Sequence, residues 1–402
     1  MKNENLKKNL SIFLTILVVG LQFFNYFLAP ILHPNFLKQM FGHTQLIINI
    51  PYLGDWNLVM IIGRIIGAYI LCIFIIRLGF FCIMRIVVVA HIMLSISTAS
   101  LDFSKDITYT NMLIITINRF FYAFLTPASF MMPSLYLLSQ NFKKPVLLSS
   151  IICLAISFAA ISAFECLNFI KFTTYWYEPL LYSSILMLIC YLFFEININK
   201  VPVATLPINK RKLNYNEIFL LISFGGNCGI TMSYHFVFNE LFVHKTFLGD
   251  SYPIKSIYYC YYTLTFLLIP VAKFVYKKNL FVPLKPASLG IIFLSVINVI
   301  VPTMSSNMYI LEQIVFGALA AILVAPCHAL VYKIGSKTHN IFEGIFWFVS
   351  AYSLLALTPP FFLRLLGIEA VQWLSILYVL PISTLFIFAL TKYQKEKIVE
   401  KS

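Results

Sequence analysis

The stretch NINKVPVATLPINKRKLNYN, residues 197–216, is polar and basic in a chain that is otherwise strongly apolar. It carries two prolines and four lysine or arginine residues, and it lies near the middle of the 402 residues. A helix of about 20 apolar residues is long enough to cross the hydrocarbon core of a membrane. Working outward from this stretch, we find six such apolar segments before it and six after it. The sequence therefore predicts an all-α polytopic membrane protein with 12 transmembrane helices.

The predicted spans set the domain organisation. They cover residues 10–32, 55–77, 80–101, 109–138, 145–169, 177–196, 217–242, 254–276, 284–303, 307–333, 341–365 and 369–391. Backbone groups inside a bilayer have no water to bond, so each apolar span is expected to be a helix. We divide the chain into an N-terminal six-helix bundle at 1–196, a cytoplasmic linker at 197–216 and a C-terminal six-helix bundle at 217–402.

The distribution of basic residues predicts the orientation. Only 11% of the residues are charged, against about 25% in soluble proteins. The formal net charge is +14, and 21 of the 29 lysine and arginine residues lie in every second gap between spans. Such basic loops stay in the cytoplasm, so both termini are expected there. The lipid bilayer, rather than nucleic acid, accounts for the positive charge.

Several chemistries lack a signature in the sequence. The eight cysteines, for example Cys153 and Cys327, are scattered singly and form no C-x-x-C pair. We interpret them as packing residues and expect no metal site. No nucleotide-binding, serine hydrolase or metalloprotease motif occurs. The sequence therefore predicts neither a cofactor nor an enzyme.

The connection between the second and third spans carries the most specific motif. Residues 63–85 read GRIIGAYILCIFIIRLGFFCIMR. This stretch resembles the major facilitator superfamily, and more closely its metabolite/proton symporter branch, which includes proline/betaine transporters. Arg64 and Gly67 match an arginine and a glycine in the branch, while Arg77 and Gly79 match the cytoplasmic turn. Ile76 stands where the family has an acid. The resemblance implies a role in gating and turning for these four matching residues.

Two further segments extend the resemblance. Gln22-Phe23-Phe24-Asn25 stands where the branch has Glu-aromatic-aromatic-Asp, and Glu343-Gly344 matches the start of its eleventh helix. The family implies two bundles that rock about a central cavity, a small-molecule substrate, and coupling to protons or another cation. It implies as solute an amino acid, a betaine or a carboxylate-like metabolite. The abundant Lys, Asn, Ile and Phe suit an AT-rich bacterial genome, so a bacterial inner membrane is expected.

Ionisable residues inside spans are the first candidates for function, since they are expensive there. Arg119 lies about ten residues into the fourth span, and a guanidinium binds a carboxylate through two hydrogen bonds. An internal structural pair explains Arg119 equally well, and Arg64 is interpreted as structural. Glu312 lies in the tenth span, and one hypothesis pairs it with Arg119 in one state of the protein.

Polar residues in the first and seventh spans complete the candidate set. Gln22, Asn25, Asn227 and His235 are expected to line the cavity with Arg119 and Glu312. Histidine titrates near neutral pH and relays protons, but a lone histidine in a membrane helix is as often a structural donor. Coupling would fall to Glu312, Glu240 or a histidine, or else the protein is a facilitator.

Two other classes of function remain as alternatives. A transporter-like membrane sensor or receptor that has lost transport would explain the departures from the turn motif. The tail of about ten residues after the last span leaves no room for an output domain and argues against it. A polytopic membrane enzyme ranks last because no paired His/Asp constellation lies near an interface.

Overall fold

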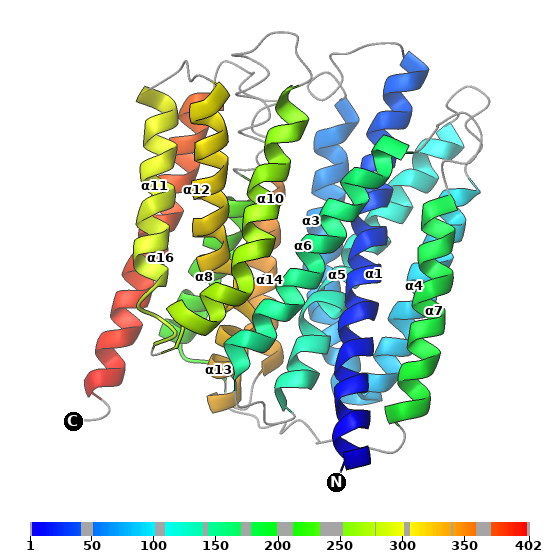
Figure 1. The fold of residues 1–402 in the computed structure, drawn as a ribbon, viewed down its shortest axis with the longest axis horizontal. Coiled ribbons are helices and arrows are strands. Elements are labelled where there is room, and N and C mark those ends of the chain that lie inside the picture. The colour runs from blue at the N-terminus through cyan, green and yellow to red at the C-terminus, as the bar shows by residue number, and fades with distance from the viewer. Residues whose placement is uncertain are drawn as a thin grey trace. The chain divides into compact units, whose positions relative to one another are not determined.

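The computed structural model in Figure 1 is all-helical over the residues that it describes. These are residues 2–41, 51–100, 109–139, 144–169, 178–198, 212–233, 252–277, 279–300, 306–338, 341–358 and 371–399. Within these ranges no β-strand occurs, and the helices form twelve segments at the places of the twelve predicted spans. The predicted all-α polytopic fold is therefore confirmed.

The helices have the following bounds. The first half of the chain contains α1 (Lys2–Phe41), α3 (Pro51–Leu78), α4 (Phe80–Ala99), α5 (Tyr109–Ser139), α6 (Pro145–Phe169) and α7 (Glu178–Ile198). The second half contains α8 (Tyr215–Ser233), α10 (Tyr252–Pro270), the π-helix η2 (Val271–Val275), α11 (Leu284–Ile300), α12 (Ser306–Val324), α13 (Cys327–Thr338), α14 (Ile341–Leu357) and α16 (Val371–Val399). In the described part of the chain, eight helical stretches are long and apolar enough to cross a membrane.

The chain divides into two compact units. Unit 1 comprises Met1–Lys143 and Leu154–Pro207, and unit 2 comprises Lys144–Cys153 and Ile208–Ser402. The break at 207–208 falls inside the predicted linker. The first residues of α6 belong to unit 2, a division that the sequence does not reveal.

Glycine allows two helices of unit 1 to approach backbone to backbone. A Cβ at Gly67 of α3 would overlap the carbonyl group of Phe124 on α5. One turn earlier, a Cβ at Gly63 would lie 2.6 Å from the carbonyl oxygen of Phe120. Small residues four apart are a common device of membrane helix pairs, because association there depends on close packing. The glycine matched by the family motif therefore sets the distance between α3 and α5.

A second glycine turns the chain between α3 and α4. Gly79 has φ 82° and is the one residue between the two helices. Its N–H donates to the carbonyl oxygen of Ile75 at 2.9 Å, which closes the end of α3. Positive φ is unstrained for glycine and costly for other residues. Gly79 thus forms the tight turn that the motif predicts, and Arg77 beside it is exposed.

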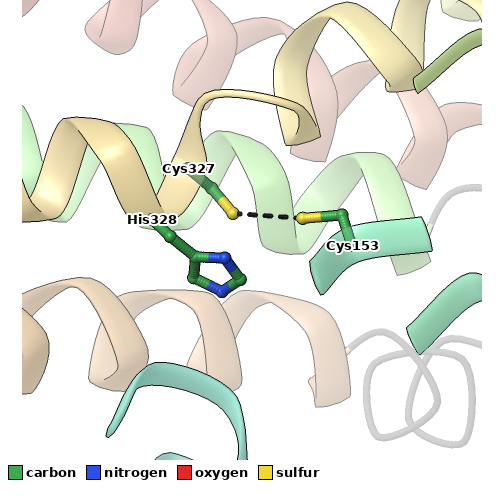
Figure 2. A group of neighbouring side chains, drawn as sticks. All are labelled: Cys153, Cys327 and His328. Carbon is green, nitrogen blue, oxygen red and sulfur yellow. Dashed lines mark hydrogen bonds between the residues drawn. The ribbon is translucent and has the colours of Figure 1, made fainter. Parts of the chain in front are cut away.

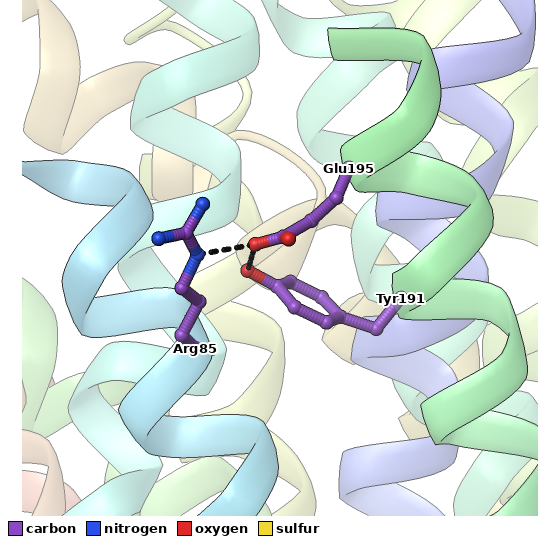
Figure 3. A network of polar contacts seen from close by, with 3 residues as sticks. All are labelled: Arg85, Tyr191 and Glu195. Atoms are coloured by element: carbon purple, nitrogen blue, oxygen red, sulfur yellow. Dashed lines mark hydrogen bonds and ion pairs between the residues drawn. The ribbon is translucent and has the colours of Figure 1, made fainter. Parts of the chain in front are cut away.

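An ion pair ties α4 to α7 within unit 1 (Figure 3). Arg85 Nε lies 2.5 Å from Glu195 Oε1, and the hydroxyl group of Tyr191 donates to the same oxygen at 2.6 Å. Glu195 and Tyr191 are one turn apart on α7, so the carboxylate is shared by two donors. The network links these two helices near the end of α7.

In unit 2, aromatic packing and a helix cap position α8. Phe224 of α8 packs against Phe348 of α14 and Phe386 of α16, with ring centroids 5.5 and 5.3 Å away. All three side chains are buried. Asn214 and Glu217 cap the start of α8 reciprocally, with bonds of 2.8 and 3.1 Å to each other's backbone N–H. Such reciprocal caps satisfy N–H groups that a helix start leaves open.

Candidate functional site

Arg64 is buried inside unit 1 and meets α1 at Tyr26. Only 6% of Arg64 is exposed, and its guanidinium group donates a hydrogen bond to the hydroxyl group of Tyr26. The same guanidinium lies over the Tyr26 ring, 5.3 Å from the centroid. A cation held by a hydroxyl oxygen and an aromatic face is stabilised away from water. The structure thus gives Arg64 a partner that ties α3 to α1.

Arg119 brings a second guanidinium into the same unit. It lies on α5 with 3% of its surface exposed, and it interacts electrostatically with Tyr26. Positive side chains from α3 and α5 therefore both act on one tyrosine of α1. Two buried cations in one bundle repel each other unless anionic or polar groups lie near them.

Aromatic rings surround Tyr26. Phe23 lies 6.0 Å from Tyr26 and 6.0 Å from Phe130 of α5, and Phe27 lies 5.5 Å from Tyr26. These rings are an apolar wall around Tyr26, whose own ring faces the Arg64 guanidinium. A low-polarity wall strengthens the attraction of a guanidinium for an anion, since less water screens it.

Gln22 lies one turn before Tyr26 on α1 and is fully buried. Neither its amide nitrogen nor its amide oxygen has a hydrogen-bond partner among the described residues. A buried amide without partners is destabilising by about 1–3 kcal/mol and is rare in folded proteins. Such a group marks a place where a water molecule or a ligand supplies the missing bonds.

Unlike Gln22, Asn25 has hydrogen-bond partners among the described residues for both ends of its amide, and these partners lie on other helices of the same bundle. Its amide nitrogen donates to Ser95 of α4 at 3.3 Å and to Ser184 of α7 at 3.1 Å. Its amide oxygen accepts from the hydroxyl group of Ser183. Asn25 is fully buried and joins three helices.

Asn227 has the same role in unit 2. Its amide nitrogen donates to Ser288 of α11 at 3.1 Å, and its oxygen accepts from Ser383 of α16 at 2.7 Å. This asparagine is also fully buried. Both candidates from the sequence are therefore placed as ties between helices.

Glu312 and Gln313 are the polar pair of α12 in unit 2. Glu312 is 6% exposed, and its Oε1 accepts from Asn298 of α11 at 2.7 Å. Its Oε2 has no hydrogen-bond partner in the described part of the chain. Gln313 is fully buried, and neither end of its amide is bonded among the described residues. These two side chains leave three polar atoms available for a solute, water or a proton.

The tenth span is interrupted at Ala325–Pro326, between α12 and α13. Proline has no N–H to donate, and the N–H of His328 donates to the hydroxyl group of Ser149 on α6 at 3.2 Å. A helix end leaves four carbonyl groups without intrahelical partners. Side chains bond all four, as Tyr276, Cys228, Cys153 and Ser150 donate to the carbonyl groups of Ile322, Leu323, Val324 and Ala325.

Three potential metal ligands meet at this interruption (Figure 2). Cys153 of α6 and Cys327, the first residue of α13, have their sulfur atoms 3.7 Å apart. The imidazole of His328 lies beside them, and the three ligand atoms are within 4.8 Å of one another. All three residues are buried.

The structure does not reach every predicted site residue. His235 and Glu240 lie outside the described residues, as does most of the predicted linker. The remaining predicted site residues are described, and they belong to several local groups. Arg64 and Arg119 share Tyr26, while Gly67, Arg77 and Gly79 belong to the close packing of α3 and its turn into α4.

Comparison with solved structures decides the fold. The chain is similar to the proton:xylose symporter XylE of the major facilitator superfamily, solved with 6-bromo-6-deoxy-D-glucose bound. The TM-score is 0.70 at 16% identity, over 96% of this chain and 95% of that one. The chain has the major facilitator fold. The human organic anion transporter MFSD10 (TETRAN) is similar too, with a TM-score of 0.66, 14% identity and coverage of 95% and 99%.

These likenesses rest on structure. No protein-family model and no curated protein matches the sequence. The major facilitator fold comprises two six-helix halves, and the chain is accordingly an integral, multi-pass membrane protein.

Several residues of the site carry no signal in the sequence. Tyr26 is one of 23 tyrosines, and only the spacing of four from Gln22 places it on the same face of α1. Gln313 follows Glu312 directly, and a polar pair inside a span is a signal that could have identified it. Cys153 and Cys327 are 174 residues apart, so no local pattern could join them.

Proposed function

We propose that this chain is a secondary transporter that moves a small polar solute across the membrane by alternating access. The observation that supports the proposal best is the match of the whole chain to transporters of the major facilitator fold. In such folds the solute site lies near the middle of the bilayer between repeated halves, and rocking exposes it to each side in turn. The domain boundaries that we propose for the two rocking bundles are 1–196 and 217–402.

The solute that we propose carries a carboxylate, as in an amino acid, a betaine or a related metabolite. Arg119 supports this choice because a guanidinium matches a carboxylate in charge and in geometry. The amide of Gln22 adds a donor and an acceptor that the described residues leave unused. The solutes of the metabolite/proton symporter branch, which the motif at 63–85 resembles, include compounds of this kind.

Coupling and orientation complete the proposal. Glu312 is the acid that we propose for coupling to protons, because it is buried and one of its oxygens has no partner among the described residues. From the basic gaps we further propose that both termini face the cytoplasm of a bacterial cell, with the protein in the inner membrane.

Counterflow in liposomes tests the transport proposal. Purified protein is reconstituted into vesicles loaded with one unlabelled solute, and entry of the same labelled solute is measured for a panel of amino acids, betaines and carboxylates. Empty liposomes and the R119Q variant are the controls. We expect transient accumulation of at least one carboxylate-bearing solute. Binding of a solute by the purified protein without any counterflow would instead favour a sensor.

The orientation needs a separate measurement. Tags accessible to a membrane-impermeant reagent are placed at each end of the chain, and labelling is compared in intact and permeabilised cells. We expect both tags to react only after permeabilisation. Reaction of one tag in intact cells would contradict an even number of spans with both ends inside.

A further inference from the structure

Two thiols and an imidazole from distant parts of the chain meet inside unit 2 (Figure 2). Cys153, Cys327 and His328 are 2%, 2% and 0% exposed. Their ligand atoms lie within 4.8 Å of one another. A third thiol, Cys228 of α8, interacts electrostatically with both cysteines. Soft sulfur ligands and a neutral imidazole together are the donor set of thiophilic metal ions.

We propose that Cys153, Cys327 and His328 bind a thiophilic divalent cation, of which Zn²⁺ is the best match in charge. Tetrahedral zinc has Zn–S bonds of about 2.3 Å, which puts two coordinating sulfur atoms about 3.8 Å apart. The two sulfur atoms lie at 3.7 Å. A disulfide would need about 2.0 Å, so the two thiols are not bonded to each other; their hydrogen-bond contact has the spacing that two zinc ligands also need.

The charges favour zinc over a monovalent ion. Two thiolates and a neutral imidazole carry two negative charges, and Zn²⁺ cancels both. The complex is then neutral in surroundings where net charge is strongly unfavourable. A Cu⁺ ion on the same three ligands would leave one negative charge buried. Three protein ligands are also the number that zinc sites with an open fourth position use.

The interruption of the tenth span prepares this site. Cys327 is the first residue of α13, and the positive end of a helix dipole stabilises a thiolate there. Ser149 accepts a hydrogen bond from the N–H of His328 at 3.2 Å, which fixes the first turn of α13. Ser149 and Cys153 are one turn apart on α6. The same face of α6 therefore orients α13 and supplies one ligand.

A simpler explanation is that the thiols only donate hydrogen bonds to the carbonyl groups that the interrupted helix leaves open. Cys153 donates to the carbonyl oxygen of Val324 at 3.6 Å, which supports that explanation. Serine in place of Cys153 keeps an O–H donor for this carbonyl group but is a poor ligand for zinc. The C153S and C327S variants therefore separate the two explanations. Zinc binding requires the sulfur atom, whereas bonding the open carbonyl group of Val324 requires only a hydrogen-bond donor.

Metal content of the full-length protein is the primary test. Cells expressing the wild type are grown with added Zn²⁺, and the protein is purified in detergent under reducing conditions without chelator. We expect about one zinc per chain by elemental analysis. In C153S and C327S we expect loss of the bound zinc, with an affinity at least about 100-fold weaker. The C72S variant is the matched control, because Cys72 is a buried cysteine of α3 outside the cluster.

X-ray absorption at the zinc edge of the wild type provides a second measurement that needs no variant. We expect two sulfur neighbours at about 2.3 Å and at least one nitrogen at about 2.0 Å. Purified wild type without zinc overturns the proposal, as does zinc without sulfur neighbours or an equal zinc content in C153S and C327S. Because these experiments measure binding alone, their result is independent of whether the protein transports a solute.

Discussion

Asn25 and Asn227 make the same pattern of bonds in the two halves of the chain. Each donates its amide N–H to a serine of the third helix of its half and accepts from a serine of the sixth. The serine that receives the bond, Ser95 or Ser288, donates its own hydrogen to the carbonyl group four residues earlier. Serine in a membrane helix can do both, because its oxygen keeps lone pairs after donating. Each half is thus fastened at a polar node between three helices.

We predict that removing either asparagine lowers the stability of the protein but leaves its affinity for the solute unchanged. In N25A or N227A the hydrogen bonds between helices are lost, while Ser95 and Ser288 keep their bonds to backbone carbonyl groups. We therefore expect the free energy of unfolding to fall by about 1 kcal/mol. Thermal unfolding in detergent measures the change, and the Michaelis constant for the solute should stay constant. Asn307 is exposed at the start of α12, and N307A is the matched control. An unchanged melting temperature with abolished transport would mean that the asparagine contacts the solute.

The bond between Arg64 and Tyr26 predicts an energetic coupling between α3 and α1. In a double-mutant cycle, Y26F removes only the hydroxyl group, and R64M removes the charge while keeping much of the bulk. We expect a coupling free energy of about 1.5–3 kcal/mol, the usual contribution of a hydrogen bond to a charged group. The same cycle made with Y69F, a tyrosine exposed on α3, is the control. A coupling free energy near zero would show that the bond between Arg64 and Tyr26 does not stabilise the packing of α3 against α1.

The sequence predicted the positions of the helices and of the tight turn at Gly79 well. Hydrophobic length predicted the places of the twelve helical segments that the described residues form, because the bilayer imposes a similar helix length throughout. Gly79 was predictable as a turn because a single residue between two helices needs a conformation that glycine adopts at no cost. Both properties are local, so one stretch of sequence contains all the information.

The contacts of the site were less predictable, because they depend on rotation of helices about their axes. Gln22 and Asn25 are three residues apart and looked equivalent in the sequence. In the structure Asn25 is saturated by serines, while the Gln22 amide has no partner among the described residues. Cys153 and Cys327 belong to helices that only the fold brings together. Spacing along the chain carries no information about such pairs.

Arg119 is predicted to bind the carboxylate of the solute. In R119Q we expect the efficiency of uptake to fall by about 30-fold or more, as when one partner of a buried charge pair is removed. In R119K the charge is kept but the two-pronged geometry is lost, so most of the defect should remain. Uptake is measured in liposomes with equal amounts of folded protein. The K392Q variant, at an exposed site on α16, controls for loss of positive charge.

A thermal-shift measurement distinguishes binding from folding in these variants. If Arg119 contacts the solute, the solute should raise the melting temperature of the wild type but not that of R119Q. Normal uptake by R119K would instead assign the side chain to an internal structural pair.

Glu312 is predicted to carry proton coupling. In E312Q the amide oxygen still accepts the bond from Asn298, so α11 and α12 should stay in place while the titrating group is gone. We expect the wild type to accumulate solute in a proton gradient and to lose accumulation when an ionophore collapses it. The variant should fail to accumulate solute yet keep counterflow, which needs no gradient. Wild-type uptake that an ionophore does not affect would make the protein a facilitator. Full accumulation by E312Q would show that another acid or a histidine, rather than Glu312, carries the proton coupling.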